Sequence, residues 1–218
     1  MLENQVLVRT KRRRQLQVCQ QADDLAKLLG ELTGDVCEHR IVSFCRISPA
    51  GFLRWVADQT YIRRLSLSTF RVGPRALRLL SELHGQGQLG EARFVLGRLV
   101  ASRHRRNNEL DYWERLLSLC ETFGWQACSI ANHTKVALFD TDAGKFVLEG
   151  SANLNEAPNW EQYCFQRDDE LFDFYDQVFD QMFAFAASAA DQSVLPDEED
   201  EDEEEGLGWP EDDRPLLW

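Results

Sequence analysis

The stretch QACSIANHTKVALFDTDAGKFVLEGSANLNEAPNWE, residues 126–161, decides the fold class. It contains three short, largely apolar runs, 126–130, 135–140 and 145–150, and the tight turn Asp142-Ala-Gly144 joins the last two. Apolar runs of this length are typical of strands, and a short connection that contains glycine indicates a hairpin. The stretch therefore predicts three strands in quick succession.

The sequence before this stretch alternates between segments that favour strands and segments that favour helices. Ser48-Pro49 and Gly73-Pro74 are typical helix starts, because serine and glycine suit the cap and proline is tolerated in the first turn. Strands that alternate with helices imply an α/β fold, in which a mostly parallel mixed sheet is flanked by helices. The expected segments are a helix over 15–32, strands over 41–45, 64–70 and 92–100, and helices over 48–59, 75–84, 108–123 and 168–190.

The charge divides the chain into parts of different character. Residues 196–218 hold twelve acidic residues and one arginine, so they account for −11 of the net charge of −13, whereas residues 1–160 carry a net +5. The acidic average therefore says little about what the body of the chain binds. We expect a basic arm and helix over 1–38, a folded domain over 39–195 and an acidic tail over 196–218.

The acidic tail contains an unbroken run of nine acidic residues, 197–205, which cannot form a core and predicts disorder. Three roles stay open for it. It can aid solubility, or it can fold over a basic site as a mimic of nucleic acid. It can also bind a basic partner protein through its acids and through the terminal residues Trp209, Pro210 and Leu216 to Trp218.

Five polar residues within the deciding stretch can perform phosphodiester chemistry. His133 and Lys135 are two residues apart at the start of a predicted strand, so their side chains project to the same side. An imidazole can attack phosphorus, while the ammonium of Lys135 and the amide of Asn153 can neutralise and orient the phosphate oxygens without a metal ion. Ser151 and Glu161 are suited to fix the tautomer and orientation of the imidazole. The chemistry therefore calls for neither a metal nor a cofactor.

The order of these residues resembles the signature of the phospholipase D superfamily. Residues 133–140 read H-x-K-x4-D, residues 150–153 read G-S-x-N, and residues 159–161 read N-x-E. Nine residues separate the first two elements where six are common in the family, which a longer hairpin would accommodate. The resemblance implies a phosphodiesterase with catalytic roles for His133, Lys135, Ser151, Asn153 and Glu161 and supporting roles for Asp140 and Asn159.

The sequence contains one copy of this motif, although the reaction also needs a second histidine to protonate the leaving oxygen and then to activate water. His39, His84 and His104 lack the lysine two residues further on. In the superfamily that the chain resembles, members with a single motif pair as symmetric dimers. The resemblance therefore implies a homodimer, in which one His133 is the nucleophile and the other is the general acid.

The resemblance implies two substrate classes, nucleic acids and phospholipids. Arg103, Arg105 and Arg106 lie in a predicted strand-to-helix loop, at the edge where α/β folds place ligands, and arginine can bind phosphate oxygens through paired donors. The same cluster can also be a solvated loop. Because no membrane span or membrane-surface helix is expected, nucleic acid is favoured, and no motif that reads bases accompanies it.

We therefore expect a metal-independent DNA nuclease that works as a homodimer in the cytoplasm. The alternative is a non-catalytic nucleic-acid-binding or scaffolding subunit with the same fold, and a phospholipid-cleaving enzyme is a third possibility. The six cysteines lack Cys-x-x-Cys spacing and favour reduced, buried thiols, while Cys19, Cys37 and His39 are poorly spaced for a metal. No secretory signal is expected, since no apolar run follows the basic residues near the N-terminus.

Overall fold

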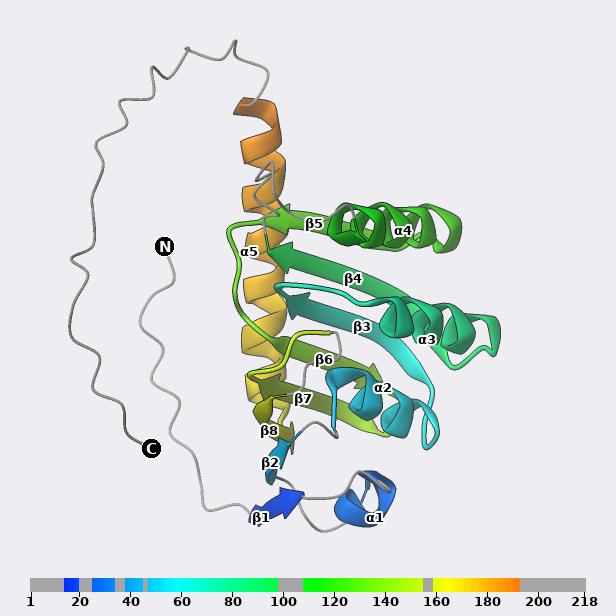
Figure 1. Cartoon of the computed structure of the whole chain (residues 1–218), viewed down its shortest axis with the longest axis vertical. Coiled ribbons are helices and arrows are strands. Elements are labelled where there is room, and N and C mark those ends of the chain that lie inside the picture. The colour runs from blue at the N-terminus through cyan, green and yellow to red at the C-terminus, as the bar shows by residue number, and fades with distance from the viewer. Residues whose placement is uncertain are drawn as a thin grey trace, which may run out of the picture.

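The structure, a computed structural model, forms one sheet with helices on both of its faces (Figure 1). The N-terminal basic arm, the loop that holds Arg103, Arg105 and Arg106, and the acidic tail lie outside the described residues. The described residues are 14–19, 25–33, 38–44, 47–97, 108–154 and 159–192.

Within the described residues the sheet has eight strands: β1 (Arg14–Cys19), β2 (Glu38–Phe44), β3 (Ile62–Thr69), β4 (Leu89–Gly97), β5 (Gln126–Ile130), β6 (Val136–Thr141), β7 (Gly144–Gly150) and β8 (Trp160–Arg167). Their order across the sheet is β1-β2-β8-β7-β6-β3-β4-β5. The pairs β1–β2, β3–β4 and β4–β5 are parallel, whereas β8, β7 and β6 join the two groups through antiparallel pairs. Only β6 and β8 run against the common direction, which confirms the expected mostly parallel mixed sheet.

In the part of the chain that the structure describes, five helices flank the sheet: α1 (Leu25–Leu29), α2 (Pro49–Ala57), α3 (Pro74–Gly85), α4 (Asn108–Phe123) and α5 (Asp169–Gln192). Figure 1 shows α1 to α4 on one face and the long α5 across the other. The predicted start of α2 is confirmed, because the Ser48 hydroxyl accepts from the Gly51 amide at 3.4 Å and Pro49 occupies the first turn. None of the described helices is long and apolar enough to cross a membrane.

The sheet buries apolar side chains on both faces, so the core has two layers. On the side of α1 to α4, the Phe165 ring packs between those of Phe52 and Phe146, at centroid distances of 5.9 and 5.6 Å. On the other side, Phe172 and Phe179 of α5 pack against the central strands. Each such ring contributes about 1.5–3 kcal/mol relative to an exposed position. A sheet covered on both faces is a rigid support for a site at its edge.

The N-terminal prediction of a helix over 15–32 is wrong in its first half. Residues Arg14–Cys19 form β1, which pairs with β2 in parallel, and among the described residues of this stretch the helix is confined to Leu25–Leu29. The segment RQLQVC alternates polar and apolar residues around Leu16 and Val18, a period of two that also suits a strand. The open edge of β2 supplies the backbone partners, which favours the strand.

The sequence interpretation also missed strand β8, which lies inside the sheet between β2 and β7. Tyr163, Cys164 and Phe165 are all buried, because this strand is covered on both faces. A strand of this kind lacks the polar–apolar alternation by which an exposed strand is recognised. It carries Glu161, one of the residues predicted for the site.

The predicted hairpin between β6 and β7 is confirmed. Thr141 pairs with Gly144 across a two-residue turn, and Gly144 has a φ of 129°, a conformation that favours glycine. The Thr141 hydroxyl donates to the Gly144 carbonyl at 2.8 Å and accepts from the Ala143 amide at 3.1 Å. The hairpin thus accommodates the residues that separate the H-x-K-x4-D element of the motif from the G-S-x-N element.

Acidic residues of α5 neutralise arginines on the face of the sheet that the helix covers. Asp176 binds Arg93 at 2.6 Å and Arg64 at 2.7 Å, and Arg93 also binds Asp180 at 2.5 Å. The Arg93 side chain is only 11% exposed, so these contacts hold the helix to the sheet. Arg64 and Arg93 are therefore paired with acidic residues of α5.

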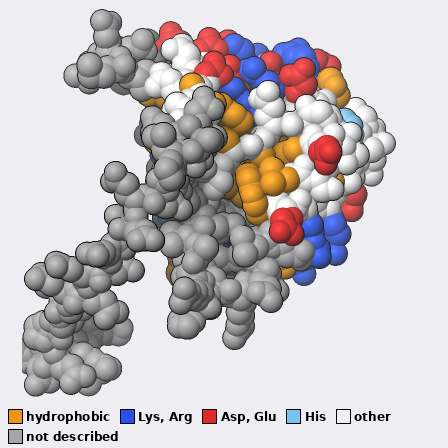
Figure 2. Space-filling view, turned by 90° about the horizontal axis from the view of Figure 1, so that it is seen from above, with side chains coloured by type: hydrophobic (Ala, Val, Ile, Leu, Met, Phe, Trp, Pro, Cys, Tyr) orange, Lys and Arg blue, Asp and Glu red, His pale blue; other side chains and the backbone are white. Residues whose placement is uncertain are grey.

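The face of the molecule seen in Figure 2 is neither uniformly basic nor uniformly acidic where its residues are described. An apolar patch lies in the middle of this face, and basic and acidic side chains are intermixed around it where the residues are described. The net positive charge of the body is therefore not gathered on the visible part of this face.

Candidate active site

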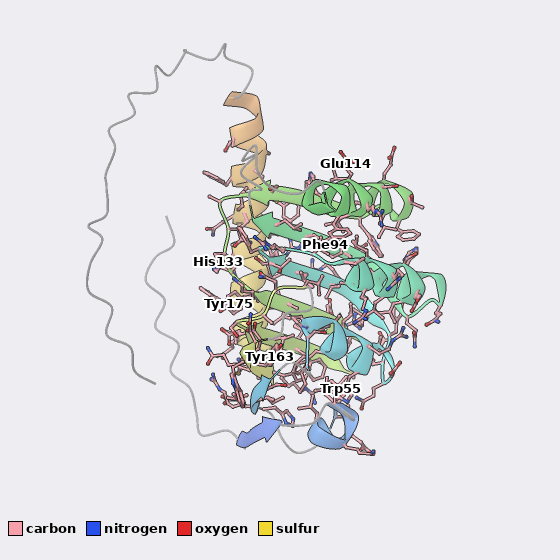
Figure 3. All side chains as sticks on the ribbon, in the orientation of Figure 1. Trp55, Phe94, Glu114, His133, Tyr163 and Tyr175 are labelled. Carbon is pink, nitrogen blue, oxygen red and sulfur yellow. The ribbon has the colours of Figure 1, made fainter. Side chains whose placement is uncertain are left out.

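His133, Lys135, Ser151 and Asn153 lie at the edge of the sheet where β3, β4 and β5 end. His133 belongs to the segment that connects β5 to β6, and its side chain is exposed. Figure 3 shows it at this edge, beyond the ends of the strands. The carboxyl ends of parallel strands are where α/β folds bind ligands, because the polar groups of several loops meet there.

A buried asparagine next to His133 holds this segment in place. The Asn132 side chain is 8% exposed, and its amide nitrogen donates to the Ser68 hydroxyl at 2.9 Å and to the Val95 carbonyl at 3.3 Å. Its oxygen accepts from the Thr134 amide at 3.0 Å and from the Thr134 hydroxyl at 2.8 Å. These bonds tie the segment to the ends of β3 and β4, so the backbone at His133 is fixed although its side chain is exposed.

The ammonium of Lys135 contacts the imidazole of His133. Its Nζ lies 2.9 Å from Nδ1 and 3.3 Å from Nε2, and it donates to the main-chain oxygen of His133 at 2.7 Å. The Phe70 ring flanks the imidazole, with a centroid distance of 5.3 Å. A positive charge that can bind a phosphate oxygen is thus beside the ring that would attack phosphorus.

Lys135 is half-buried, and this affects its pKa. Partial burial lowers the pKa of Lys135 below its ordinary value, because the ammonium loses hydration, while the nearby carboxylate of Glu161 opposes this shift. The carbonyl of Lys135 accepts from the Gly150 amide at 3.1 Å, which joins the start of β6 to the end of β7. The first and second elements of the motif therefore meet in space.

Gly150, the first residue of the second element, lies where the backbone closely approaches β8. A Cβ at this position would lie 3.0 Å from the Gln162 carbonyl oxygen and 3.0 Å from the Tyr163 ring. The Tyr163 hydroxyl donates to the Ile47 carbonyl at 2.6 Å, and burial raises the pKa of Tyr163. The ring is therefore anchored, and it has little room to move away from a side chain at position 150.

Ser151 and Glu161 form a second contact within the motif. The Ser151 hydroxyl donates to Glu161 Oε2 and accepts from the Gln162 amide at 3.0 Å. The Ser151 amide donates to the Gln162 carbonyl at 3.1 Å, which fixes the backbone. The hydroxyl thus orients the carboxylate, and the structure shows Glu161 bound to Ser151 where the sequence led us to expect both to orient the imidazole.

Asn153 joins the two halves of the site through Phe70. Its Oδ1 accepts from the Phe70 amide at 3.2 Å, which leaves its Nδ2 as a donor. The Phe70 ring also packs beside His133. Phe70, which directly follows β3, therefore contacts both the element that contains His133 and the element that contains Asn153. The arrangement offers an imidazole, an ammonium and an amide donor around one exposed edge.

The remaining predicted residues lie away from these groups or outside the described part. Asp140 is near the other end of β6, where its carboxylate binds Arg63 at 2.5 Å. Asn159 is exposed and directly precedes β8. Within the described residues, no three His, Cys, Asp or Glu side chains gather as a possible metal site. Arg103, Arg105 and Arg106 precede α4 and lie outside the described residues.

The comparisons with known proteins concern the fold alone. No family model matches the sequence, and no curated protein matches it. Among solved structures, polyphosphate kinase from Porphyromonas gingivalis matches over 67% of this chain, with 16% identity and a TM-score of 0.49. Phosphatidylserine synthase from Haemophilus influenzae Rd KW20 matches over 70%, with 16% identity and a TM-score of 0.47.

A third match is TrmBL2, an archaeal chromatin protein described with a novel mode of DNA binding. It covers 74% of this chain, with 12% identity and a TM-score of 0.45. The chain spans 26% of the kinase, 40% of the synthase and 58% of the chromatin protein. The likeness is therefore to a part of each larger protein, and none of their activities follows from it.

Proposed function

We propose that the chain is a metal-independent phosphodiesterase that cleaves DNA in the cytoplasm, through a covalent phosphohistidine at a site shared by two copies. The observation that carries this proposal is the contact between the Lys135 ammonium and the His133 imidazole, at 2.9 Å, on an exposed edge of a rigid sheet. This pair combines a nucleophile with a cation for the phosphate oxygens.

The reaction has two steps. A ring nitrogen of His133 forms a bond to phosphorus while the bond from phosphorus to the leaving oxygen breaks, and that oxygen takes a proton from the second imidazole. Water then attacks the phosphohistidine, gives its proton to the second imidazole and releases the ring. Lys135 and the Nδ2 of Asn153 bind the non-bridging oxygens, whose negative charge grows in both transition states.

The second imidazole comes from a second copy of the chain. Among the other histidines in the described residues, His39 is 5% exposed within β2, and His84 packs against Phe123 with a centroid distance of 4.2 Å. His133 and Ser151 are exposed, so a two-fold axis can pass beside them and bring two copies of the motif together. The two roles then belong to the same residue in the two subunits.

The charge of the chain supports DNA as the substrate. Residues 1–160 carry a net charge of +5. Two of their arginines, Arg64 and Arg93, are neutralised by acidic residues of α5. Phosphate contacts are therefore assigned to Lys135 and to the cluster of Arg103, Arg105 and Arg106. Binding through phosphates alone predicts strong salt dependence and little preference for base sequence.

The test is cleavage of DNA by the purified chain in excess EDTA, with binding measured by gel shift in the same buffer. We expect cleavage and a native mass of two chains. Binding without cleavage would identify a non-catalytic nucleic-acid-binding subunit. Hydrolysis of a soluble phospholipid analogue, with DNA left intact, would identify a lipid-cleaving enzyme. A protein that stays monomeric while it cleaves DNA would contradict the shared site.

A further inference from the structure

A cavity of about 420 Å³ lies next to the candidate active site. It is lined by residues that follow β3, by the first turns of α2 and α3, and by Tyr112 and Trp113 of α4. Its volume falls within the range of pockets that bind small molecules, about 300–1,000 Å³. The cavity is thus large enough for a flat organic group.

The cavity and the active site share a wall. Phe70 lines the cavity and also packs beside the His133 imidazole, with a centroid distance of 5.3 Å. Leu154 lines the cavity from the same segment that carries Asn153, and this segment is fixed by bonds from the Leu154 amide to the Thr69 hydroxyl and from the Gly73 amide to the Leu154 carbonyl. A group bound in the cavity and a phosphate held at His133 can therefore belong to the same substrate molecule.

The lining combines aromatic rings with positive charge. Tyr112 and Trp113 of α4, both half-buried, line the cavity together with Phe70. Arg71 and Arg75 also line the cavity, and the Arg71 guanidinium lies 5.3 Å from the centroid of the Phe70 ring. Rings and guanidinium planes stack on nucleobases of any sequence, whereas an acyl chain gains nothing from the two arginines.

We propose that this cavity receives a nucleobase adjacent to the scissile phosphate, and that Trp113 and Tyr112 form the stacking surface. This assignment rests on the proposed phosphodiesterase function and adds a specificity for nucleosides. It makes the enzyme prefer a phosphodiester that carries a base at this position over one that carries a small alkyl group, without a preference for one base sequence.

The test compares two substrates that share the leaving group, thymidine 5′-(p-nitrophenyl phosphate) and methyl p-nitrophenyl phosphate. The full-length parent should show a higher kcat/KM for the thymidine ester by roughly 5- to 150-fold, the range expected for one stacked base. Trp113→Ala and the more volume-conserving Trp113→Leu should both lower the ratio of the two kcat/KM values toward one. Leu117→Ala, an exposed position one turn along α4, should keep the parent's ratio.

The outcomes separate this assignment from the proposed function. A ratio near one in the parent, or a ratio that the Trp113 variants leave unchanged, would overturn the base site while the phosphodiesterase stands. If neither ester is hydrolysed, the proposed phosphodiesterase function is wrong, and calorimetric titration with the dinucleotide pTpT tests whether the cavity binds a base. Binding by the parent and by Leu117→Ala, with at least tenfold weaker binding by Trp113→Leu, supports it; equal binding or no binding overturns it.

Discussion

Replacing His133 by alanine is expected to lower the rate of DNA cleavage in EDTA by about 10³-fold or more, because the substitution removes the atom that bonds to phosphorus. In a symmetric dimer the same substitution also removes the general acid, so both chemical steps are affected. DNA affinity should change little, since Lys135 and the cluster of Arg103, Arg105 and Arg106 remain. Cleavage and binding should be measured on the same preparation of each variant.

A matched control is the histidine of α3. His84 Nδ1 bonds to the Leu89 carbonyl at 3.0 Å, and its ring packs against Phe123 and Trp125, on the helical face and away from the motif. His84→Gln keeps a polar group at this position and should cleave DNA within about twofold of the parent below its unfolding temperature, because surface and peripheral changes act mainly on stability. Full activity in His133→Ala would contradict the assignment of the nucleophile.

Replacing Lys135 by methionine is expected to lower kcat for DNA cleavage by about 10²–10³-fold, the cost of removing one preorganised charge from the phosphate oxygens. Methionine fills similar space and tolerates the half-buried position, so the effect reports the charge. Lys135→Arg keeps a positive charge and should recover part of the activity. Equal loss in both variants would mean that the position matters for packing and not for charge.

The pH dependence of the reaction provides a second measure of Lys135. Because burial lowers the pKa of Lys135, its ammonium loses its proton at a lower pH than an ordinary lysine, and kcat/KM should fall on the alkaline side accordingly. Arginine stays charged throughout this range, so Lys135→Arg should move the fall to higher pH. An alkaline fall at the same pH in both proteins would show that another group titrates.

Much of the fold follows from local signals in the sequence. The predicted bounds of α4 and β5 agree with the structure, because Gly124, with a φ of 71°, separates a clear helical period from a short apolar run. The strands β1 and β8 could not be found in the same way. The first depends on the free edge of β2, and the second is buried on both faces, so neither is determined by its own pattern alone.

The candidate site was predictable where its residues are close in sequence. His133 and Lys135 meet because they are two residues apart. The contact of Ser151 with Glu161 was not predicted, because it depends on the pairing of β7 with β8, the strand that the sequence interpretation missed. The support of the site was missed, since it depends on contacts such as that between Asn132 and Ser68, which are 64 residues apart. A lone asparagine carries no signal in the sequence that would reveal its burial.

The most direct test of the central claim is the number of phosphoryl groups that become attached to the protein. DNA labelled at the scissile phosphate is mixed with the enzyme in EDTA, the reaction is stopped within one turnover in alkali, and the attached label is counted and located by peptide mapping. The account predicts a label on His133, stable in alkali and lost in acid, at no more than one for every two chains. One label per chain would contradict the shared site, and a label on another residue, or cleavage with no label at all, would contradict the nucleophile.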